Sequence, residues 1–200
     1  MDIRKSRTSP HEHFEGKHRF EHWYRDNQVY FITSTCRDHA HAMKADEAKQ
    51  IFWTQFDRYT QQFGFVPWVT SLLSNHYHTL GYLKTRDDLP VMMQRVHGSV
   101  AKLVNDVLVD KLTPFWTTSG KQNYFDGCIR DELQCRRAYR YVLTQCRRHR
   151  ICDRPEEYPH THVAIHVDRG VKRALELSAF LVGVPYARYI KNRERKGHAG

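Results

Sequence analysis

Two histidines separated by a single residue, His76 and His78, carry the clearest chemical signal in the chain. On a β-strand, alternate side chains point to the same face, so both imidazoles would lie side by side and could chelate a divalent metal ion. Tyr77 between them would enter the opposite, packed layer. Other pairs have the same spacing, in His11-Glu12-His13, His39-Ala40-His41 and His160-Thr161-His162. Those pairs lie in polar or loop-like segments, where a solvated histidine is the default, whereas His76 and His78 lie on a predicted central strand.

A tyrosine on a later helix is the second candidate for chemistry. The apolar positions of that helix follow one another at helical spacing: Cys135, Tyr139, Val142 and Cys146. This stripe places Tyr139 in the core and leaves Tyr141 outside it. The helical neighbours of Tyr141 are Arg137, Gln145 and Arg148. Such surroundings suit a tyrosine that meets a phosphate group, and the structural alternative is an exposed tyrosine packed over arginine side chains.

The chain is strongly basic. Its 200 residues carry a formal net charge of +10, and its 14 histidines are not counted in that sum. This charge indicates nucleic acid or another anionic surface as the partner. Basic residues gather around the helix of Tyr141, and we expect these to contact DNA phosphates: Lys121, Arg130, Arg136, Arg137, Arg140, Arg147 and Arg148. Trp116 and Tyr124 are expected to stack on unpaired bases, and the alternative for the basic run is a solvated helix face.

Apolar periodicity predicts the elements that would position these residues. Strands are expected at 29–36, 66–73 and 77–83, with a short strand around 124–129, and helices at 45–63, 89–112 and 131–148. Their order is that of a ferredoxin-like split βαβ fold. We therefore expect an α+β protein in which an antiparallel sheet carries the two histidines. An added C-terminal helix would carry Tyr141, and a small helical tail would follow.

The composition divides the chain into three parts. Residues 1–24 are polar and without periodicity, which predicts a flexible arm, and residues 25–160 form the main domain. Residues 161–200 form the tail, with helices expected at 175–182 and 186–193 around a Gly-Val-Pro turn. Two short helices around such a turn fit a DNA-binding helix-turn-helix and equally fit a helical hairpin packed on the main domain.

The five cysteines are odd in number and show no CxxC spacing, so neither a disulfide framework nor a zinc ribbon is indicated. Cys135 and Cys146 are expected to be small core residues. No apolar stretch approaches the roughly 20 residues of a membrane span, and the polar N-terminus lacks the apolar region of a signal peptide. We expect a cytoplasmic protein, associated with the bacterial nucleoid, without a membrane partner.

Taken together, these features resemble one family. From about Val29 to Ile151 the chain resembles the REP-associated tyrosine transposases, relatives of the single-tyrosine insertion-sequence transposases in the HUH endonuclease superfamily. The likeness rests on Tyr30-Phe31-Ile32-Thr33, Asn75-His76-Tyr77-His78, Tyr124-Phe125-Asp126 to Ile129-Arg130, and Tyr141-x-x-x-Gln145, in that order. Three places depart from the family pattern. Gln145-Cys146 stands where the family usually has Asn-Pro, and Tyr77 replaces an aliphatic residue. Leu73-Ser74 stands before Asn75, where the family usually has Met-Pro.

The resemblance implies an activity and a set of roles. His76 and His78 would bind Mg²⁺ or Mn²⁺ with Gln145 as third ligand, and Tyr141 would attack the phosphate of single-stranded DNA near a hairpin. The products would be a 5′-phosphotyrosine and a free 3′-hydroxyl. The 3′ end of a second strand could then attack the phosphotyrosine and reverse the reaction. The expected partners are single-stranded or hairpin DNA, with a homodimer left open.

Two other functions are compatible with the sequence. A nucleic-acid-binding relative with weakened catalysis would fit the replacement of the family's Asn-Pro. A ferredoxin-like RNA-binding protein with incidental histidines would instead show aromatic residues on an exposed sheet face and would bind without metal.

Overall fold

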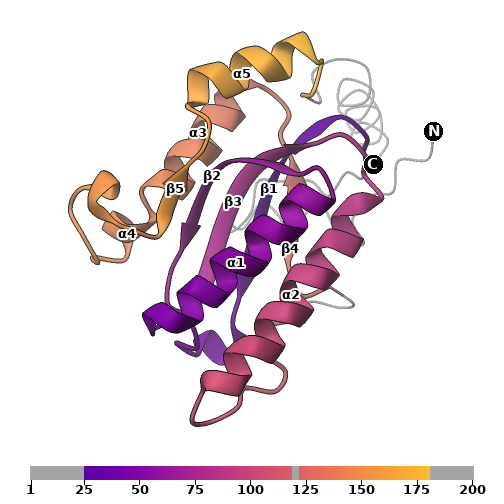
Figure 1. Ribbon diagram of the computed structural model, residues 1–200. Helices are drawn as coiled ribbons and strands as arrows, with labels where there is room; N and C mark the ends of the chain where they lie inside the picture. The colour runs from indigo at the N-terminus through magenta and orange to yellow at the C-terminus, as the bar shows by residue number, and fades with distance from the viewer. Residues whose placement is uncertain (1–24, 119–121, 181–200) are drawn as a thin grey trace, which may run out of the picture.

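The computed structural model describes residues 25–118 and 122–180. The strands are β1 (Gln28–Thr35), β2 (Val66–Leu72), β3 (His76–Leu83), β4 (Phe125–Cys128) and β5 (Thr161–Val163). The α-helices are α1 (Asp46–Gln62), α2 (Asp88–Val107), α3 (Glu132–Leu143), α4 (Gln145–Arg148) and α5 (Val167–Glu176), and 3-10 turns lie at Arg37–His39 and Pro155–Glu157. The predicted order of elements from the first strand to the third helix is confirmed (Figure 1).

The strands form one antiparallel sheet in the order β4-β1-β3-β2-β5. Strands β1 and β3 pair along their full length, from Gln28 opposite Leu83 to Thr35 opposite His76. The first four strands follow the ferredoxin-like plan, so the expected α+β class is confirmed. Strand β5 is not foreseen by the sequence because it is too short to show an alternation. It pairs with β2 through Ser71 opposite Thr161, which joins residues 161–163 to the main sheet.

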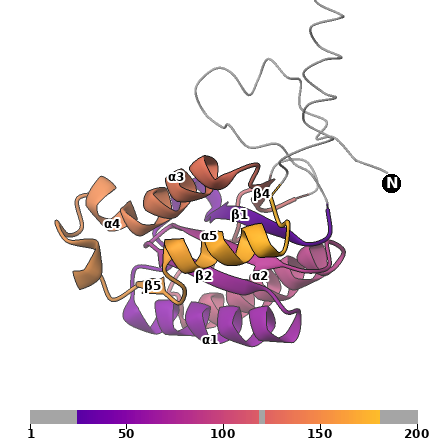
Figure 2. The ribbon, with the colours of Figure 1, turned by 90° about the horizontal axis from the view of Figure 1, so that it is seen from above.

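Helices α1 and α2 cover one face of the sheet (Figure 2). Each presents a buried apolar stripe at helical spacing, with Phe52 and Phe56 on α1 and Met92, Val96, Val100 and Val104 on α2. These side chains pack against alternate residues of β1 and β3, namely Tyr30, Ile32 and Tyr77. Tyr77 therefore points into this layer, as the alternation along the strand predicts.

A buried polar chain crosses the same layer. The hydroxyl of Tyr77 lies 2.9 Å from Nε2 of His97 on α2, and Nδ1 of His97 lies 2.8 Å from Oδ1 of Asn123. Burial lowers the pKa of His97 to about 4, so this ring is neutral at neutral pH. Trp116 stacks on His97 and donates its Nε1–H to the His97 carbonyl. Trp116 is thus a core residue, and the expectation that it stacks on unpaired bases is wrong.

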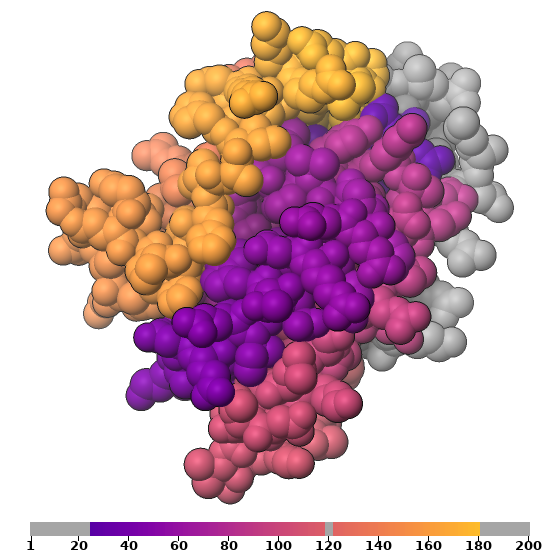
Figure 3. Space-filling model, viewed as in Figure 1, coloured from indigo at the N-terminus to yellow at the C-terminus, as the bar shows by residue number. Residues whose placement is uncertain are grey.

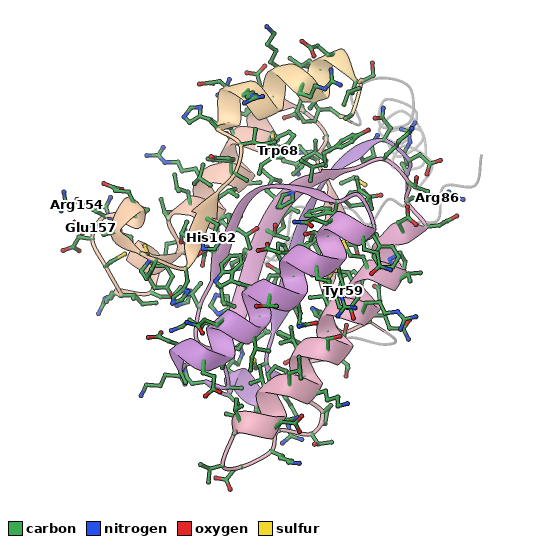
Figure 4. The ribbon with its side chains drawn as sticks, in the orientation of Figure 1. Tyr59, Trp68, Arg86, Arg154, Glu157 and His162 are labelled. Carbon is green, nitrogen blue, oxygen red and sulfur yellow. The ribbon has the colours of Figure 1, made fainter. Side chains whose placement is uncertain are left out.

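Helices α3 and α5 cover the opposite face, where Phe31 packs with Tyr139 of α3 and Val171 of α5. Helix α5 approaches β2 closely because Gly170 has no side chain. A Cβ there would lie 2.6 Å from the ring of Trp68, which Figure 4 shows beneath α5. Within residues 25–118 and 122–180, both faces of the sheet are therefore covered by helices, which disfavours an RNA-binding protein with an open sheet face.

Two helices of the main domain end differently from the sequence expectation. The helix expected at 89–112 ends at Val107, because both polar groups of the Asn105 side chain bind the backbone of Leu112 and hold the following loop. The helix expected at 131–148 begins at Glu132, one residue later than expected, because the side chain of Asp131 caps it by accepting from the amide of Gln134. It divides at Thr144, whose hydroxyl bonds back to the carbonyl of Arg140.

The tail also differs from the expectation. The helix expected at 175–182 instead spans Val167–Glu176 and ends before Ser178, which has a positive φ of 52°. Its buried residues, Val171 and Ala174 among them, fix it to α3 and β2. The second expected helix, at 186–193, and the arm at 1–24 lie outside the described residues.

The segment between α4 and β5 stands out at one side of the molecule (Figure 3). Arg154 pairs with Glu157 there, and both side chains are labelled in Figure 4. All five cysteines are free thiols, and Cys135 and Cys146 are buried core residues, as predicted. Among the described residues, no helix combines the length and apolar character needed to cross a membrane.

Candidate active site

Strand β3 places His76 and His78 on the face of the sheet that α3 covers. Their side chains are largely buried, with 9% of His76 and 6% of His78 exposed. The two ring centroids are 5.1 Å apart. Two imidazoles this close, on a rigid central strand, can share one metal ion, which is the geometry that the His-x-His spacing predicts.

His76 is held in its neutral form. Its pKa falls to about 4, chiefly because burial disfavours the charged ring and also because His149 lies nearby. A neutral imidazole is the form that coordinates a metal. Oδ1 of the preceding residue, Asn75, lies 2.6 Å from Nδ1 of His76, so the ring is also fixed in orientation.

His78 is held from the neighbouring strand. Its Nδ1 forms a hydrogen bond with the hydroxyl of Thr33, which lies opposite His78 in the pairing of β1 with β3. The ring of Phe31 stacks on that of His78 at 5.7 Å between centroids. Thr33 is a site residue that the sequence analysis does not single out, because its contact with His78 depends on the strand register.

Helix α3 brings Tyr141 to the same place. The ring centroid of Tyr141 lies 5.0 Å from that of His78, and the guanidinium of Arg148 lies 4.7 Å above the Tyr141 ring. Tyr139, in contrast, is 5% exposed and donates its hydroxyl to the carbonyl of Ile165. The helical stripe therefore separates the two tyrosines as predicted, with Tyr139 in the core and Tyr141 next to His78.

Gln145, the first residue of α4, completes the group. It is fully buried, and its Nε2 donates to the carbonyl of Tyr141 at 2.8 Å. Its side chain lies against His76 and raises the pKa of that ring, as a nearby hydrogen-bond acceptor does, which partly offsets the lowering by burial. Yet the buried Oε1 of Gln145 reaches no donor with the distance and angle of a formed hydrogen bond. A buried acceptor without a donor is costly, and a bound cation would satisfy it.

These donors fit a divalent cation. Two imidazole nitrogens and one amide oxygen leave coordination positions for water and phosphate oxygens, which suits Mg²⁺ or Mn²⁺. Nowhere in the described part of the chain do three or more His, Cys, Asp or Glu side chains gather in a way that could hold a metal ion. A cation at this place would therefore depend on Gln145 as well as on the two histidines.

His149 also belongs to this group, although the sequence analysis does not include it. Its ring centroid lies 4.9 Å from that of His76, and burial together with Arg148 lowers its pKa. The signal that could reveal it is its spacing. His149 follows Gln145 by one helical turn, so the two side chains lie on the same side of α4.

The arginines expected to contact DNA differ in their surroundings. Arg136 forms ion pairs with Glu132 and with Asp168 of α5, so its charge is balanced within the protein. Arg130 donates from its backbone and side chain to Oε1 of Gln134. The others on α3 and α4 are exposed: Arg137, Arg140, Arg147 and Arg148. Lys121 lies outside the described residues.

The fold has counterparts among solved structures. A REP-associated tyrosine transposase bound to a REP hairpin matches 84% of this chain and 96% of its own, with a TM-score of 0.59 and 12% identity. A candidate transposase from Deinococcus radiodurans R1 matches 61% of this chain and 93% of its own, with a TM-score of 0.41 and 12% identity. No protein-family model and no curated protein matches the sequence. At this identity the first likeness concerns the fold, and this chain has the fold of a REP-associated tyrosine transposase.

Proposed function

We propose that this protein is a metal-dependent single-strand DNA endonuclease and strand transferase that acts near DNA hairpins through a 5′-phosphotyrosine intermediate. One observation carries the proposal. Tyr141 lies beside His78, and Gln145 brings a buried oxygen without a donor close to His76. A side chain suited to be the nucleophile and side chains suited to bind a metal are thus close together, which supports the proposal. The fold shared with a transposase bound to a REP hairpin supports DNA as the substrate.

Tyr141 supplies the nucleophile in this proposal. Its hydroxyl oxygen attacks the scissile phosphorus and loses its proton to solvent, while the bond to the 3′ oxygen breaks and that oxygen takes up a proton. The products are a phosphodiester between Tyr141 and the 5′ end and a strand with a free 3′-hydroxyl. A second 3′-hydroxyl can reverse the step and join two strands. Phe31 and Arg148 hold the Tyr141 ring in place for the attack.

His76, His78 and Gln145 would hold Mg²⁺ or Mn²⁺ next to the phosphate. Such an ion, when bound, polarises the phosphate and stabilises the departing 3′ oxygen. The exposed arginines of α3 and α4 would bind the flanking phosphates. Association with nucleoid DNA and formation of a homodimer stay predictions.

A denaturing gel tests whether the protein forms a covalent adduct with DNA and which side of the cleaved bond it is joined to. A pool of single-stranded hairpins with randomised flanks is labelled at either the 3′ or the 5′ end and incubated with Mn²⁺ or Mg²⁺. The 3′ label should move with the protein, and the 5′ label should appear on a shorter strand. Tyr141→Phe and His76→Ala should abolish both products. Tyr139→Phe is the matched control and should retain them.

The opposite results have distinct meanings. An adduct that survives in Tyr141→Phe would assign the nucleophile to another residue. An adduct on the 5′-labelled fragment would show that the protein is joined to the 3′ end of the cleaved strand and not to its 5′ end. Hairpin binding without an adduct under either metal would favour a nucleic-acid-binding relative with weakened catalysis, in which Gln145-Cys146 replaces the family's Asn-Pro.

A further inference from the structure

The imidazoles of His76 and His78 are both hydrogen-bonded at the same ring atom. Nδ1 of His76 lies 2.6 Å from Oδ1 of Asn75, and Nδ1 of His78 bonds with Oγ1 of Thr33. The two partners come from different places, Asn75 from the turn before β3 and Thr33 from β1. In each ring the protein thus contacts Nδ1, while Nε2 is the other nitrogen that can bind a metal.

Only one of these partners decides where the proton sits. A hydroxyl both donates and accepts, so Thr33 fixes the position of the His78 ring and permits either tautomer. An amide oxygen only accepts, so a hydrogen bond to Oδ1 of Asn75 requires a proton on Nδ1 of His76. The orientation of the Asn75 amide therefore determines the tautomer of His76.

That orientation is set by the loop before α1. Nδ2 of Asn75 lies 3.2 Å from the carbonyl oxygen of His39. A carbonyl only accepts, so the amide group facing it must be the NH₂, and the oxygen must face His76. The backbone of Asn75 is held as well, since its carbonyl accepts from the amide of Cys36 at 2.7 Å.

The Gln145 side chain lies against the other side of the His76 ring. With the proton held on Nδ1, the remaining ring nitrogen, Nε2, keeps a lone pair that can bind a cation.

We propose that Asn75 is a positioning residue that holds His76 in the Nδ1–H tautomer, so that the lone pair of Nε2 faces Gln145 and a bound cation. The consequence for metal binding rests on the function proposed above, whereas the tautomer does not depend on it. Partners of this kind commonly change metal affinity by about 10- to 100-fold.

Long-range ¹H–¹⁵N NMR on histidine-labelled protein in EDTA tests the tautomer directly. The wild type should show His76 protonated at Nδ1. Asn75→Leu removes the acceptor, and the proton should move to Nε2. Asn75→Asp keeps an acceptor oxygen and should keep the Nδ1–H signal. Thr33→Val serves as the matched control, because it cuts the other imidazole contact and should leave the His76 tautomer unchanged.

Mn²⁺ titration followed by electron paramagnetic resonance gives the second readout. Asn75→Leu should bind Mn²⁺ about 10- to 100-fold more weakly than the wild type, and Asn75→Asp should recover most of the loss. Wild-type protein in which His76 is protonated at Nε2 would overturn the inference, whether or not the protein binds Mn²⁺. Wild-type protein with the Nδ1–H tautomer that binds no Mn²⁺ would support the role of Asn75 in setting the tautomer and would overturn the proposed metal function.

Discussion

The ring of Tyr141 meets the ring of His78 edge to face, at an angle of 76° between their planes. This contact joins a candidate nucleophile on α3 to a candidate ligand on β3. The two roles are separable because a phenylalanine would keep the ring contact and lose only the hydroxyl. A histidine replaced by alanine would lose both the contact and the ligand.

We expect Tyr141→Phe to bind Mn²⁺ as the wild type does and to form no covalent DNA adduct. His78→Ala should lose both properties. Paramagnetic resonance measures the metal, and the denaturing gel measures the adduct. A Tyr141→Phe protein with at least tenfold weaker Mn²⁺ binding would show that the hydroxyl belongs to the metal site.

Gln145→Leu should separate metal binding from stability. The substitution removes a buried oxygen that accepts no hydrogen bond, a group that costs roughly 1–3 kcal/mol. It also removes the bond from Nε2 to the Tyr141 carbonyl. In EDTA we therefore expect a free energy of unfolding close to that of the wild type, with the rise of the melting temperature on addition of Mn²⁺ lost.

Gln134→Leu is the matched control, since Gln134 is a buried glutamine whose Oε1 is bonded to Arg130. It should cost about 1 kcal/mol and keep the response to Mn²⁺. A Gln145→Leu protein that Mn²⁺ stabilises as much as the wild type would remove Gln145 from the ligand set.

His97 should make the fold sensitive to acid. Its pKa in the folded protein is about 4, below the ordinary value of about 6.5. Between these values the unfolded chain binds the proton and the folded protein does not, so stability falls as pH falls. The loss should reach on the order of 3 kcal/mol near pH 4. Urea unfolding from pH 7.5 down to pH 4.5 should show a shallower loss in His97→Gln, and equal slopes would contradict the assignment.

The environment of His97 supports the expected loss of stability at low pH. The groups facing its ring are Tyr77, Asn123, Trp116 and Tyr124. All are uncharged at neutral pH, so none of them compensates for a proton on the ring. His97→Gln keeps a polar group next to Tyr77 and Asn123 and removes the titration.

Arg147 and Arg136 should contribute differently to DNA binding. Arg147 is exposed on α4, whereas Arg136 is held by Glu132 and Asp168. Arg147→Ala should weaken hairpin binding and lower the slope of log affinity against log salt by roughly one. Arg136→Ala should change that slope much less and lower the melting temperature slightly, because it releases α5 from α3. Fluorescence anisotropy at several salt concentrations distinguishes the two, and a larger slope change for Arg136→Ala would reverse the assignment.

Two glycines should respond oppositely to alanine. At Gly170 a Cβ would lie 2.6 Å from the Trp68 ring, so Gly170→Ala should cost about 1–3 kcal/mol as α5 is pushed from β2. At Gly98, inside α2, a Cβ would meet nothing within 4 Å. Gly98→Ala should therefore stabilise the protein by about 1 kcal/mol. Urea unfolding measures both, and a neutral Gly170→Ala would show that the close approach of α5 to β2 is not required.

The elements that carry the candidate site are predictable because their local patterns are strong. The alternation around His76 and His78 identifies both the strand and its faces, and the apolar stripe through Tyr139 identifies which tyrosine is buried. Trp116 misleads because nothing local distinguishes an aromatic residue in a polar loop from one that packs on a buried histidine. Its burial follows from contact with His97 on α2, which only the tertiary fold provides.

Contacts between distant segments account for most of what the sequence does not reveal. Thr33 reaches His78 through a register between strands that are far apart in the chain. Arg136 finds Asp168 on a helix that periodicity places several residues too late. His149 is different, because one helical turn separates it from Gln145 and the spacing alone is sufficient to reveal it.

The order of the strands has a consequence for self-association. The two edges of the sheet are formed by its shortest strands, β4 with four residues and β5 with three. An edge strand offers unpaired backbone groups to another chain, and here each edge offers only a short row of them. The longer strands β1, β2 and β3, with the candidate ligands, have both neighbours in place. Two copies of the part of the chain described here would therefore gain little by extending one sheet into the next, and a homodimer built from this part would form through helices or loops.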